Sequence, residues 1–413
     1  MKTIGLLDCN NFFVSCERVF NPKARNKPAM VLSSNDGCVI ARSQEVRDLG
    51  IEMGIPVFKI KNLIKEKNIQ INSSNFHLYR DMSSRVMNIL REFVDDVEVY
   101  SIDEAFIDLS NKKDPEKFCV ELREKVKQYT GIPVSIGISN TKTLAKSANR
   151  IAKKGDGVFK IDEQNLEEVL KGIKIEDIWG VGRQNTNKLN NFGIITAFDL
   201  QSQNTEWLRK KFNIKIKDTV QELQGKPIEN MQPQSKRRKS IISSKSFGKG
   251  VQDLNILKES VTRHIENASY ELRYEKSLAR FLTVYISTGF FQNNTYHKKE
   301  TIEFEMASDD ILKFIEQANK ALDRIYKKEY VYKKTGICFS GITSKEYAYV
   351  SNLFGDTMDE INSVSKTLDN INNKFGRDTI KIASSGIKND WKPNSDFCSN
   401  RFTTNWNEIL SIK

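Results

Sequence analysis

The sequence predicts an α+β protein of several domains, in which the element order β-α-β-β-α-β occurs twice. Apolar strand patterns and amphipathic helix patterns alternate in this order over residues 3–138 and again over 241–340. Helical patterns fill much of the sequence between these two stretches. The chain of 413 residues also exceeds what one hydrophobic core usually organises, which favours three or four units of roughly 100 to 150 residues.

The first module begins with a short apolar strand, Thr3–Asp8, that ends in an acidic residue. Residues 15–75 are expected to be an insertion, with a strand at 29–33 and a helix at 43–49 that Gly50 ends. The other expected elements are a helix with apolar positions from Phe76 to Phe93, strands at 97–101 and 105–109, a helix from Asp114-Pro115 to near Gly131, and a strand at 134–138.

This order of elements makes a geometric prediction about three acidic residues. A right-handed crossover places the third strand between the first and the second, antiparallel to the first. The hairpin that joins strands two and three then lies beside the C-terminal end of strand one. Asp8 lies at that end, and Asp103 and Glu104 lie in the hairpin. Three carboxylates that are distant in sequence should therefore converge.

Converging carboxylates repel one another unless a cation lies among them, and a divalent metal ion is the usual solution. Two Mg²⁺ ions about 3.5 to 4 Å apart serve phosphoryl transfer, with one activating a 3′-hydroxyl and the other holding a triphosphate. The alternative is a turn that carries solvated acids, which is the commoner fate of an Asp-Glu pair.

Past Gly157 helical segments follow one another to about residue 223, and a basic stretch with Pro227 and Pro233 then reads as a linker. Beyond residue 345 the chain is polar, and its pattern gives no assignment. The second module is expected as a strand at 241–247, a helix at 252–275, strands at 280–287 and 300–306, a helix at 309–327 and a strand at 331–340.

The formal net charge of +12 is concentrated in two segments. Residues 226–250 hold seven basic residues and one acidic residue, and residues 140–154 hold five basic residues and none that is acidic. Such clustering indicates a polyanionic partner, most simply nucleic acid. The alternative is a solvated linker together with a solvated helix face, on which Lys142, Lys146, Arg150 and Lys154 repeat every four residues.

Composition excludes several classes of protein. No apolar run approaches the roughly 18 residues of a membrane span, and no signal peptide opens the chain, which favours the cytoplasm. The six cysteines lie far apart, which argues against a disulfide framework or a zinc site. The three histidines, His77, His264 and His297, are isolated and are expected to be structural. No G-x-x-x-x-G-K-[ST] loop is present, so a P-loop ATPase is excluded.

Four motifs carry a resemblance to a known family. They are DCNNFFVSCE at 8–17, SNDGCVIAR at 34–42, YSIDEAF at 100–106 and RFTT at 401–404. Together they resemble the Y-family translesion DNA polymerases, and most closely the catalytic subunit of bacterial DNA polymerase V. The similarity runs through almost the whole chain and is most specific over residues 1–155.

The resemblance implies a right-hand polymerase with a ferredoxin-like (βαββαβ) palm and a second βαββαβ domain, the little finger. It implies a palm at 1–14 and 75–165, fingers at 15–74, a helical thumb at 166–230, a basic linker at 231–241, a little finger at 242–345 and a tail at 346–413 that contacts an accessory protein or a clamp.

The resemblance also implies roles for individual residues near the carboxylates. Asp8, Asp103 and Glu104 match the catalytic, metal-binding carboxylates, and the backbone carbonyl of Cys9 is a further ligand for two Mg²⁺ ions, which Mn²⁺ could replace. Phe13 matches the steric gate, an aromatic ring that clashes with a 2′-hydroxyl. The remaining nucleotide-binding residues are Phe12, Arg47 and Lys153, of which the two cations match contacts to the incoming triphosphate.

Three segments are expected to contact DNA or a clamp. Residues 175–194 resemble a helix-hairpin-helix, whose glycines let backbone N–H groups approach a phosphate. The expected DNA-binding residues are Gly180, Gly182, Arg183 and Lys188, with Lys236, Arg237, Arg238, Lys239, Lys245 and Lys249 along the linker and little finger. Leu353 and Phe354 fall where polymerase V relatives carry a sliding-clamp peptide, although the usual upstream glutamine is absent.

The resemblance implies template-directed, error-prone translesion synthesis from deoxynucleoside triphosphates on primer-template DNA, without a proofreading exonuclease. It also implies an SOS-type response, a processed UmuD-like accessory dimer, a recombinase filament, and association with the nucleoid during repair. Two rival interpretations stay open. A catalytically silent DNA-binding scaffold would not need the carboxylates, and another two-metal enzyme, such as a nucleotide cyclase, would not need the helix-hairpin-helix.

Overall fold

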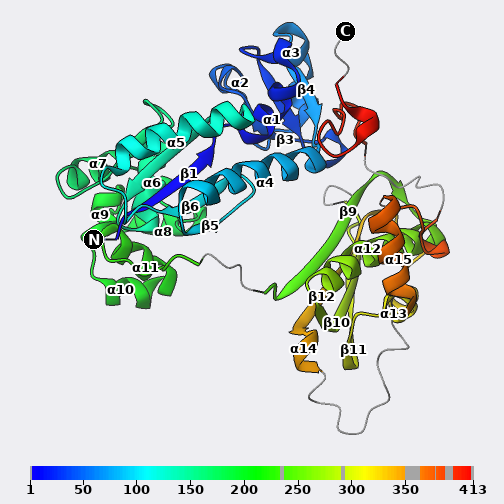
Figure 1. The fold of residues 1–413 in the computed structure, drawn as a ribbon. Coiled ribbons are helices and arrows are strands. Elements are labelled where there is room, and N and C mark those ends of the chain that lie inside the picture. Colours follow the sequence, from blue (N-terminus) through cyan, green and yellow to red (C-terminus); the bar gives the residue numbers. More distant parts are fainter. Residues whose placement is uncertain are drawn as a thin grey trace. The chain divides into compact units, whose positions relative to one another are not determined.

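The computed structural model describes residues 2–232, 237–289, 294–348, 363–376, 378–386 and 394–410. They form two compact units, each with its own hydrophobic core (Figure 1). One unit holds the described residues of 1–33, 37–235 and 396–413, and the other holds those of 34–36 and 236–395. The chain therefore leaves the first unit and returns to it at its C-terminal end.

The main sheet of the first unit has the strand order β5-β6-β1-β7-β8. Strand β6 lies between β1 and β5 and is antiparallel to β1, as the crossover argument predicts. Strand β8 at the edge was not predicted, because its short pattern follows Gly157, where helices were expected. The strands are β1 (Ile4–Cys9), β5 (Val97–Val99), β6 (Glu104–Asp108), β7 (Val134–Ser139) and β8 (Val158–Lys160).

Three helices pack on this sheet, namely α4 (Phe76–Phe93), α5 (Pro115–Thr130) and α6 (Lys142–Ala152). Because side chains alternate between the two faces of a strand, Leu6 and Phe106 share a face, and there they pack with Ala145 of α6. Asp8 follows Leu6 by two residues, and Glu104 precedes Phe106 by two. Both carboxylates therefore lie on the face that α6 covers.

Helix α6 lies unusually close to β7. A Cβ atom at Gly137 would come within 2.0 Å of the backbone nitrogen of Asn149, so only glycine allows this approach. Asn149 is buried, and its side-chain amide donates to the carbonyls of Leu6 at 3.1 Å and Ser135 at 2.7 Å. These contacts fix α6 over strands β1 and β7.

The insertion after β1 begins with helix α1 (Phe12–Phe20), where the sequence showed only an aromatic run. A three-stranded sheet of order β3-β2-β4 follows, and it confirms the strand predicted at 29–33 and the helix predicted at 43–49. Its elements are β2 (Ala29–Leu32), β3 (Val39–Arg42), α2 (Gln44–Asp48), α3 (Lys61–Glu66) and β4 (Gln70–Ser73).

Five short helices complete the first unit and end near the predicted residue 223. They surround a separate core that includes Leu189, Leu200, Leu208 and Val220. The helices are α7 (Leu166–Gly172), α8 (Arg183–Asn191), α9 (Ala197–Gln201), α10 (Thr205–Lys211) and α11 (Ile214–Leu223). Within the described residues, no helix has both the length and the apolar surface needed to cross a bilayer.

The second unit has the predicted β-α-β-β-α-β element order, but its sheet is arranged differently from the first. The strand order is β11-β10-β12-β9, so the second and fourth strands are central here, whereas the first and third are central in the first unit. Its elements are β9 (Ser240–Val251), α12 (Leu254–Tyr274), β10 (Ser277–Ser287), β11 (His297–Ser308), α13 (Ile311–Ile325) and β12 (Tyr332–Ser344).

Two further α-helices follow the second module among the described residues, in a stretch for which no element was predicted. They are α14 (Lys345–Ala348) and α15 (Ser363–Phe375). Arg273 of α12 donates to both carboxylate oxygens of Asp369 on α15, at 2.6 and 2.9 Å, and Tyr270 donates to Asn373 at 2.9 Å. Polar contacts therefore hold α15 to the second module. The helical repeat of Val364, Leu368 and Ile371 is surrounded by many Asn, Asp and Ser residues, which obscure it in the sequence.

We expect His264 to make the second unit less stable in acid. This residue of α12 is 1% exposed, and its Nδ1 lies 3.0 Å from the hydroxyl of Ser243. Burial, together with the positive charges of Lys245 and Lys334, lowers the pKa of His264 from 6.5 to about 3. Between these two pH values the unfolded chain binds the proton and the folded chain does not, so the free energy of unfolding falls as the pH falls, by up to about 1.4 kcal/mol per pH unit.

Urea denaturation followed by circular dichroism at pH 7.5 and pH 5.0 tests this expectation. The change His264→Gln should reduce the loss of stability between the two pH values. The matched change His297→Gln, at an exposed histidine of β11, should leave that loss as in the wild type. Equal pH dependence in the wild type and His264→Gln would contradict the assignment.

Candidate active site

The structure brings the three predicted carboxylates to one edge of the main sheet. Asp8, near the end of β1, is paired in register with Glu104 at the start of β6. The backbone N–H of Cys9 donates to the carbonyl of Asp103 at 2.8 Å. The Ser101 hydroxyl accepts from the backbone N–H groups of Asp103 and Glu104 and donates to the Asp103 carboxylate at 2.5 Å. The hairpin is therefore held in one conformation.

Asp8 is a buried carboxylate, and its neighbours compensate its negative charge only in part. It is 6% exposed, and Lys153 Nζ lies 2.6 Å from its Oδ2. The pKa of Asp8 is raised to about 7, because burial and the carboxylate of Glu104 raise it by more than Lys153 lowers it. Two carboxylates so close together favour binding of additional positive charge.

Helix α6 supplies the countercharges for this edge. The sequence left open whether its basic face was solvated or bound a phosphate, and the structure instead shows ion pairs along it. Lys142 is itself 2% exposed. The four pairs are Lys142 with Glu98 at 2.7 Å, Lys146 with Glu104 at 3.1 Å, Arg150 with Asp177 at 2.6 Å and Lys153 with Asp8 at 2.6 Å.

Beside the carboxylates, α1 presents an aromatic cluster. The Phe13 ring is half-buried and stacks on Tyr79 of α4, with ring centroids 4.6 Å apart and an interplanar angle of 15°. Phe76 meets Phe13 edge-on at 5.7 Å. Phe12 is 3% exposed, and its ring lies in the core.

A second cation lies at the start of α1. Arg47, on α2, is exposed, and its Nη2 donates to Asn11 Oδ1 at 2.8 Å. Asn11 has the left-handed backbone angle φ of 48° and precedes the first residue of α1. Lys153 and Arg47 thus contact the two ends of the segment that runs from Asp8 to Asn11, as an anion-binding site there would require.

Comparisons with known proteins agree with this geometry. The family model described as the impB/mucB/samB family matches residues 7–150, and the model of its C-terminal domain matches residues 238–351. Protein UmuC of Salmonella typhimurium is 38% identical over 99% of this chain and 100% of its own length. The chain belongs to the impB/mucB/samB family. A third model, described as a domain of unknown function, matches residues 362–412.

Members of the wider Y family of DNA polymerases are also similar to this chain. DNA polymerase IV of Staphylococcus aureus is 29% identical over 74% of this chain and 85% of its own length. A solved Y-family DNA polymerase chimera of Dbh and Dpo4 has a TM-score of 0.67 at 24% identity, and covers 83% of this chain and 99% of its own. The resemblance found in the motifs is thereby confirmed, and the chain has the fold of the Y-family DNA polymerases.

Membership of this family implies dependence on divalent metal ions. As the side chains stand in the described part of this chain, no three His, Cys, Asp or Glu residues converge closely enough to hold one. The donors at the sheet edge nevertheless fit such an ion, because carboxylate oxygens are the hard ligands that Mg²⁺ and related ions prefer. The amines of Lys153 and Lys146 neutralise the same negative charge that a divalent ion would neutralise.

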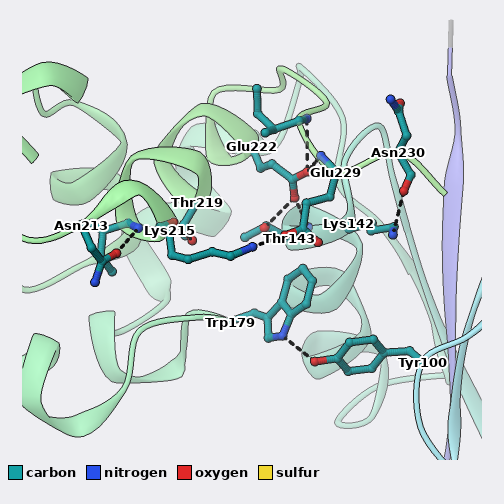
Figure 2. A network of polar contacts seen from close by, with 12 residues as sticks. Tyr100, Lys142, Thr143, Trp179, Asn213, Lys215, Thr219, Glu222, Glu229 and Asn230 are labelled. Atoms are coloured by element: carbon teal, nitrogen blue, oxygen red, sulfur yellow. Dashed lines mark hydrogen bonds and ion pairs between the residues drawn. The ribbon is translucent and has the colours of Figure 1, made fainter. Parts of the chain in front are cut away.

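The predicted helix-hairpin-helix lies against the hairpin of the carboxylates. The indole N–H of Trp179 donates to the Tyr100 hydroxyl at 3.2 Å (Figure 2). Lys146 Nζ lies 4.5 Å from the ring centroid of Tyr100 and 5.2 Å from that of Trp179. Gly180 follows with a φ of 87°, which a residue with a side chain rarely adopts. Through Trp179, the glycine turn is thus held next to the ion pair of Lys146 and Glu104.

The sequence did not reveal Glu222, which joins α11 to the start of α6. Its carboxylate is 2% exposed and accepts from the N–H and hydroxyl of Thr143, at 2.9 and 2.7 Å, and from the N–H groups of Ile228 and Glu229 (Figure 2). A lone glutamate in an amphipathic helix usually faces solvent. No local pattern therefore indicates that this one is buried.

The predicted DNA-binding cations differ in how available they are. Arg183 and Lys188 on α8 are exposed, as are Lys239, Lys245 and Lys249. Arg238 forms ion pairs with Glu271 at 2.5 Å and Glu275 at 2.9 Å, and Arg237 donates to the Ser277 hydroxyl at 2.9 Å. Strand β9 already begins at Ser240, inside the predicted linker. The residues that lie outside the described part of the chain are Lys236, Leu353 and Phe354.

We expect the change Glu222→Gln to destabilise the first unit. In either orientation the new NH₂ group faces at least one backbone N–H donor, so at least one hydrogen bond is lost, at a cost of about 1 to 3 kcal/mol. The control is Glu229→Gln, which removes only a half-exposed ion pair with Lys215 and should cost about 0.5 kcal/mol or less. Urea denaturation monitored by tryptophan fluorescence measures both, and equal losses would argue against the buried role of Glu222.

Proposed function

We propose that this protein performs error-prone translesion synthesis, extending a DNA primer opposite damaged template positions as part of an SOS-type response. The observation that carries the proposal is the backbone pairing that places Asp8, Asp103 and Glu104 at one end of the sheet, in a chain that matches its relatives over nearly its full length. A silent scaffold would have no use for a buried Asp8 beside Glu104, since this arrangement costs stability unless it serves a ligand.

We assign two Mg²⁺ ions to Asp8, Asp103, Glu104 and the Cys9 carbonyl, with Mn²⁺ as a substitute. When bound, the ions lower the pKa of the primer 3′-hydroxyl and stabilise negative charge on the triphosphate. The 3′-oxygen forms a bond to the α-phosphorus, the bond to the bridging oxygen breaks, and pyrophosphate leaves. The hydroxyl proton passes to solvent, since no side chain of the site stands out as a general base.

The chain's own cations bind the triphosphate in this proposal. Lys153, which now pairs with Asp8, and Arg47, which now pairs with Asn11, would each contact a phosphate oxygen. Charge-assisted hydrogen bonds of this kind stabilise the charge that develops on the leaving pyrophosphate. Lys146 stays with Glu104 and fixes its orientation.

We assign sugar selection to Phe13. Its ring is backed by the stacked ring of Tyr79, so a 2′-hydroxyl that meets Phe13 cannot simply displace it. Phe12 supports the site from the core rather than touching the nucleotide through its ring.

Contacts to DNA and to proteins complete the proposal. The backbone around Gly180 and Gly182, with Arg183 and Lys188, grips a phosphate of primer-template DNA. Lys236, Lys239, Lys245 and Lys249 add sequence-independent contacts. Arg237 and Arg238 contribute when DNA competes for the present partners of these two arginines. A UmuD-like accessory dimer, a recombinase filament and a sliding clamp that binds Leu353 and Phe354 are the proposed protein partners, with the nucleoid in the cytoplasm as the working location.

Primer extension tests the catalytic assignment. With Mg²⁺ and all four deoxynucleotides, the wild type should extend primers on intact and abasic templates. Asp103→Ala and Glu104→Ala should each reduce the rate at least about 100-fold, because each removes a metal ligand. Glu92→Gln, at an exposed carboxylate of α4, is the control. Binding of primer-template without any extension, even with the accessory partners present, would favour the scaffold.

A separate experiment tests the assignment of Phe13 as the steric gate. Phe13→Ala should raise kcat/KM for ribonucleotide incorporation about 10- to 100-fold relative to deoxynucleotide incorporation, because the clash with the 2′-hydroxyl is lost. The control Phe58→Ala changes a phenylalanine that is 69% exposed, and it should leave the ratio as in the wild type. No gain for Phe13→Ala would remove Phe13 from this role.

A further inference from the structure

The C-terminal segment docks on the first unit, next to the helix that backs the gate. Ser73 and Cys398 form a parallel β-bridge, in which the Ser73 N–H donates to the Phe397 carbonyl at 3.0 Å. Farther along, the Phe402 ring stacks on Phe20 of α1 with centroids 4.8 Å apart. Figure 1 shows this segment in red beside the blue strand β4. It therefore contacts both β4 and α1.

Asn75 connects the segment to the start of α4. Its Oδ1 accepts from the N–H of Leu78 at 3.2 Å and so caps the helix. Its Nδ2 donates to the carbonyls of Ser399 and Asn400, each at 3.1 Å, and to the Ser399 hydroxyl at 3.0 Å. Asn75 is 3% exposed. The same side chain thus fixes the first turn of α4 and the backbone of the C-terminal segment.

Ser399 also reaches a buried carboxylate of α1. Glu17 is 5% exposed, and its Oε1 accepts from the Ser399 hydroxyl at 3.1 Å and from the Tyr79 hydroxyl at 2.7 Å. Its Oε2 accepts from the amide of Asn72 at 3.4 Å. A buried carboxylate is costly unless donors surround it. Ser399 therefore supplies a donor, from outside the palm and fingers, to the group that holds Tyr79.

We propose that the C-terminal segment is a positioning element for sugar selection, acting from Ser399 through Glu17 and Tyr79 on Phe13. The inference rests on the proposed function, because it takes Phe13 to be the gate. Tyr79 can back Phe13 only while its ring stays in place, and the hydroxyl bond to Glu17 fixes that ring. Glu17 in turn is oriented by the donors on its other side. Ser399 and Glu17 are positioning residues, since neither contacts Phe13 or the nucleotide.

The test is the ratio of kcat/KM for deoxynucleotide to that for the matching ribonucleotide, measured by single-nucleotide incorporation with the full chain. Ser399→Ala should lower this ratio about 3- to 10-fold, because one hydrogen bond to a charged group is lost. The change should come mainly from faster ribonucleotide incorporation. Ser399→Thr keeps the hydroxyl and should restore the ratio, while Thr404→Ala, at an exposed hydroxyl of the same segment, should match the wild type.

A double-mutant cycle separates this role from general support of the fold. Tyr79→Phe keeps the ring but removes the other donor to Oε1 of Glu17. If both residues act through Glu17, Ser399→Ala with Tyr79→Phe should lower the ratio by less than the product of the single effects. A ratio for Ser399→Ala equal to that of Thr404→Ala, in a variant that still extends primers, would overturn the inference. A Phe13→Ala variant without any effect would instead overturn the gate assignment itself.

Discussion

The structure of the first unit is organised around the repulsion between two carboxylates that the β1–β6 register places side by side. Asp8 and Glu104 point to one face of the sheet, where burial makes their charges costly. One helix lies on that face, and it carries a lysine for each of them. Its position depends in turn on Gly137, which lets the helix approach, and on Asn149, which bonds it to two strands. A shift of α6 along the sheet would leave both carboxylates without a countercharge.

The same helix, α6, also positions other parts of the first unit relative to the carboxylates. Thr143, in the first turn of α6, binds Glu222 of α11. Lys153, which directly follows the last turn of α6, binds Asp8. Between them, Lys146 lies against both Glu104 and the indole of Trp179, which precedes the glycine turn. Residues proposed to hold metal and residues proposed to grip DNA are therefore set by one rigid element. A polymerase needs this coupling, since the primer end must meet the triphosphate within a fraction of an ångström.

Periodicity and topology were sufficient to predict four of the strands of the main sheet and the placement of Asp8, Asp103 and Glu104 at one end of it, because handedness leaves few ways to connect such strands. The motifs, rather than periodicity, identified Phe13, Arg47 and Lys153. The features that could not be predicted from the sequence depend on long-range contacts. Glu222 is a buried acid without any local signal. The basic face of α6 also could not be interpreted from the chain alone, since the acids that neutralise it come from distant segments.

The C-terminal segment shows how a remote part of the chain can be coupled to selection at the site. Glu17 is buried, so undocking the segment leaves its carboxylate with fewer donors and gives Tyr79 freedom to move. Docking of the segment and close packing of Phe13 on Tyr79 therefore stabilise each other. Because such coupling is reciprocal, a deoxynucleotide that packs against Phe13 should also tighten the docking of residues 397–402. The segment follows the second unit in sequence, so any partner that pulls on that part of the chain acts on the same equilibrium.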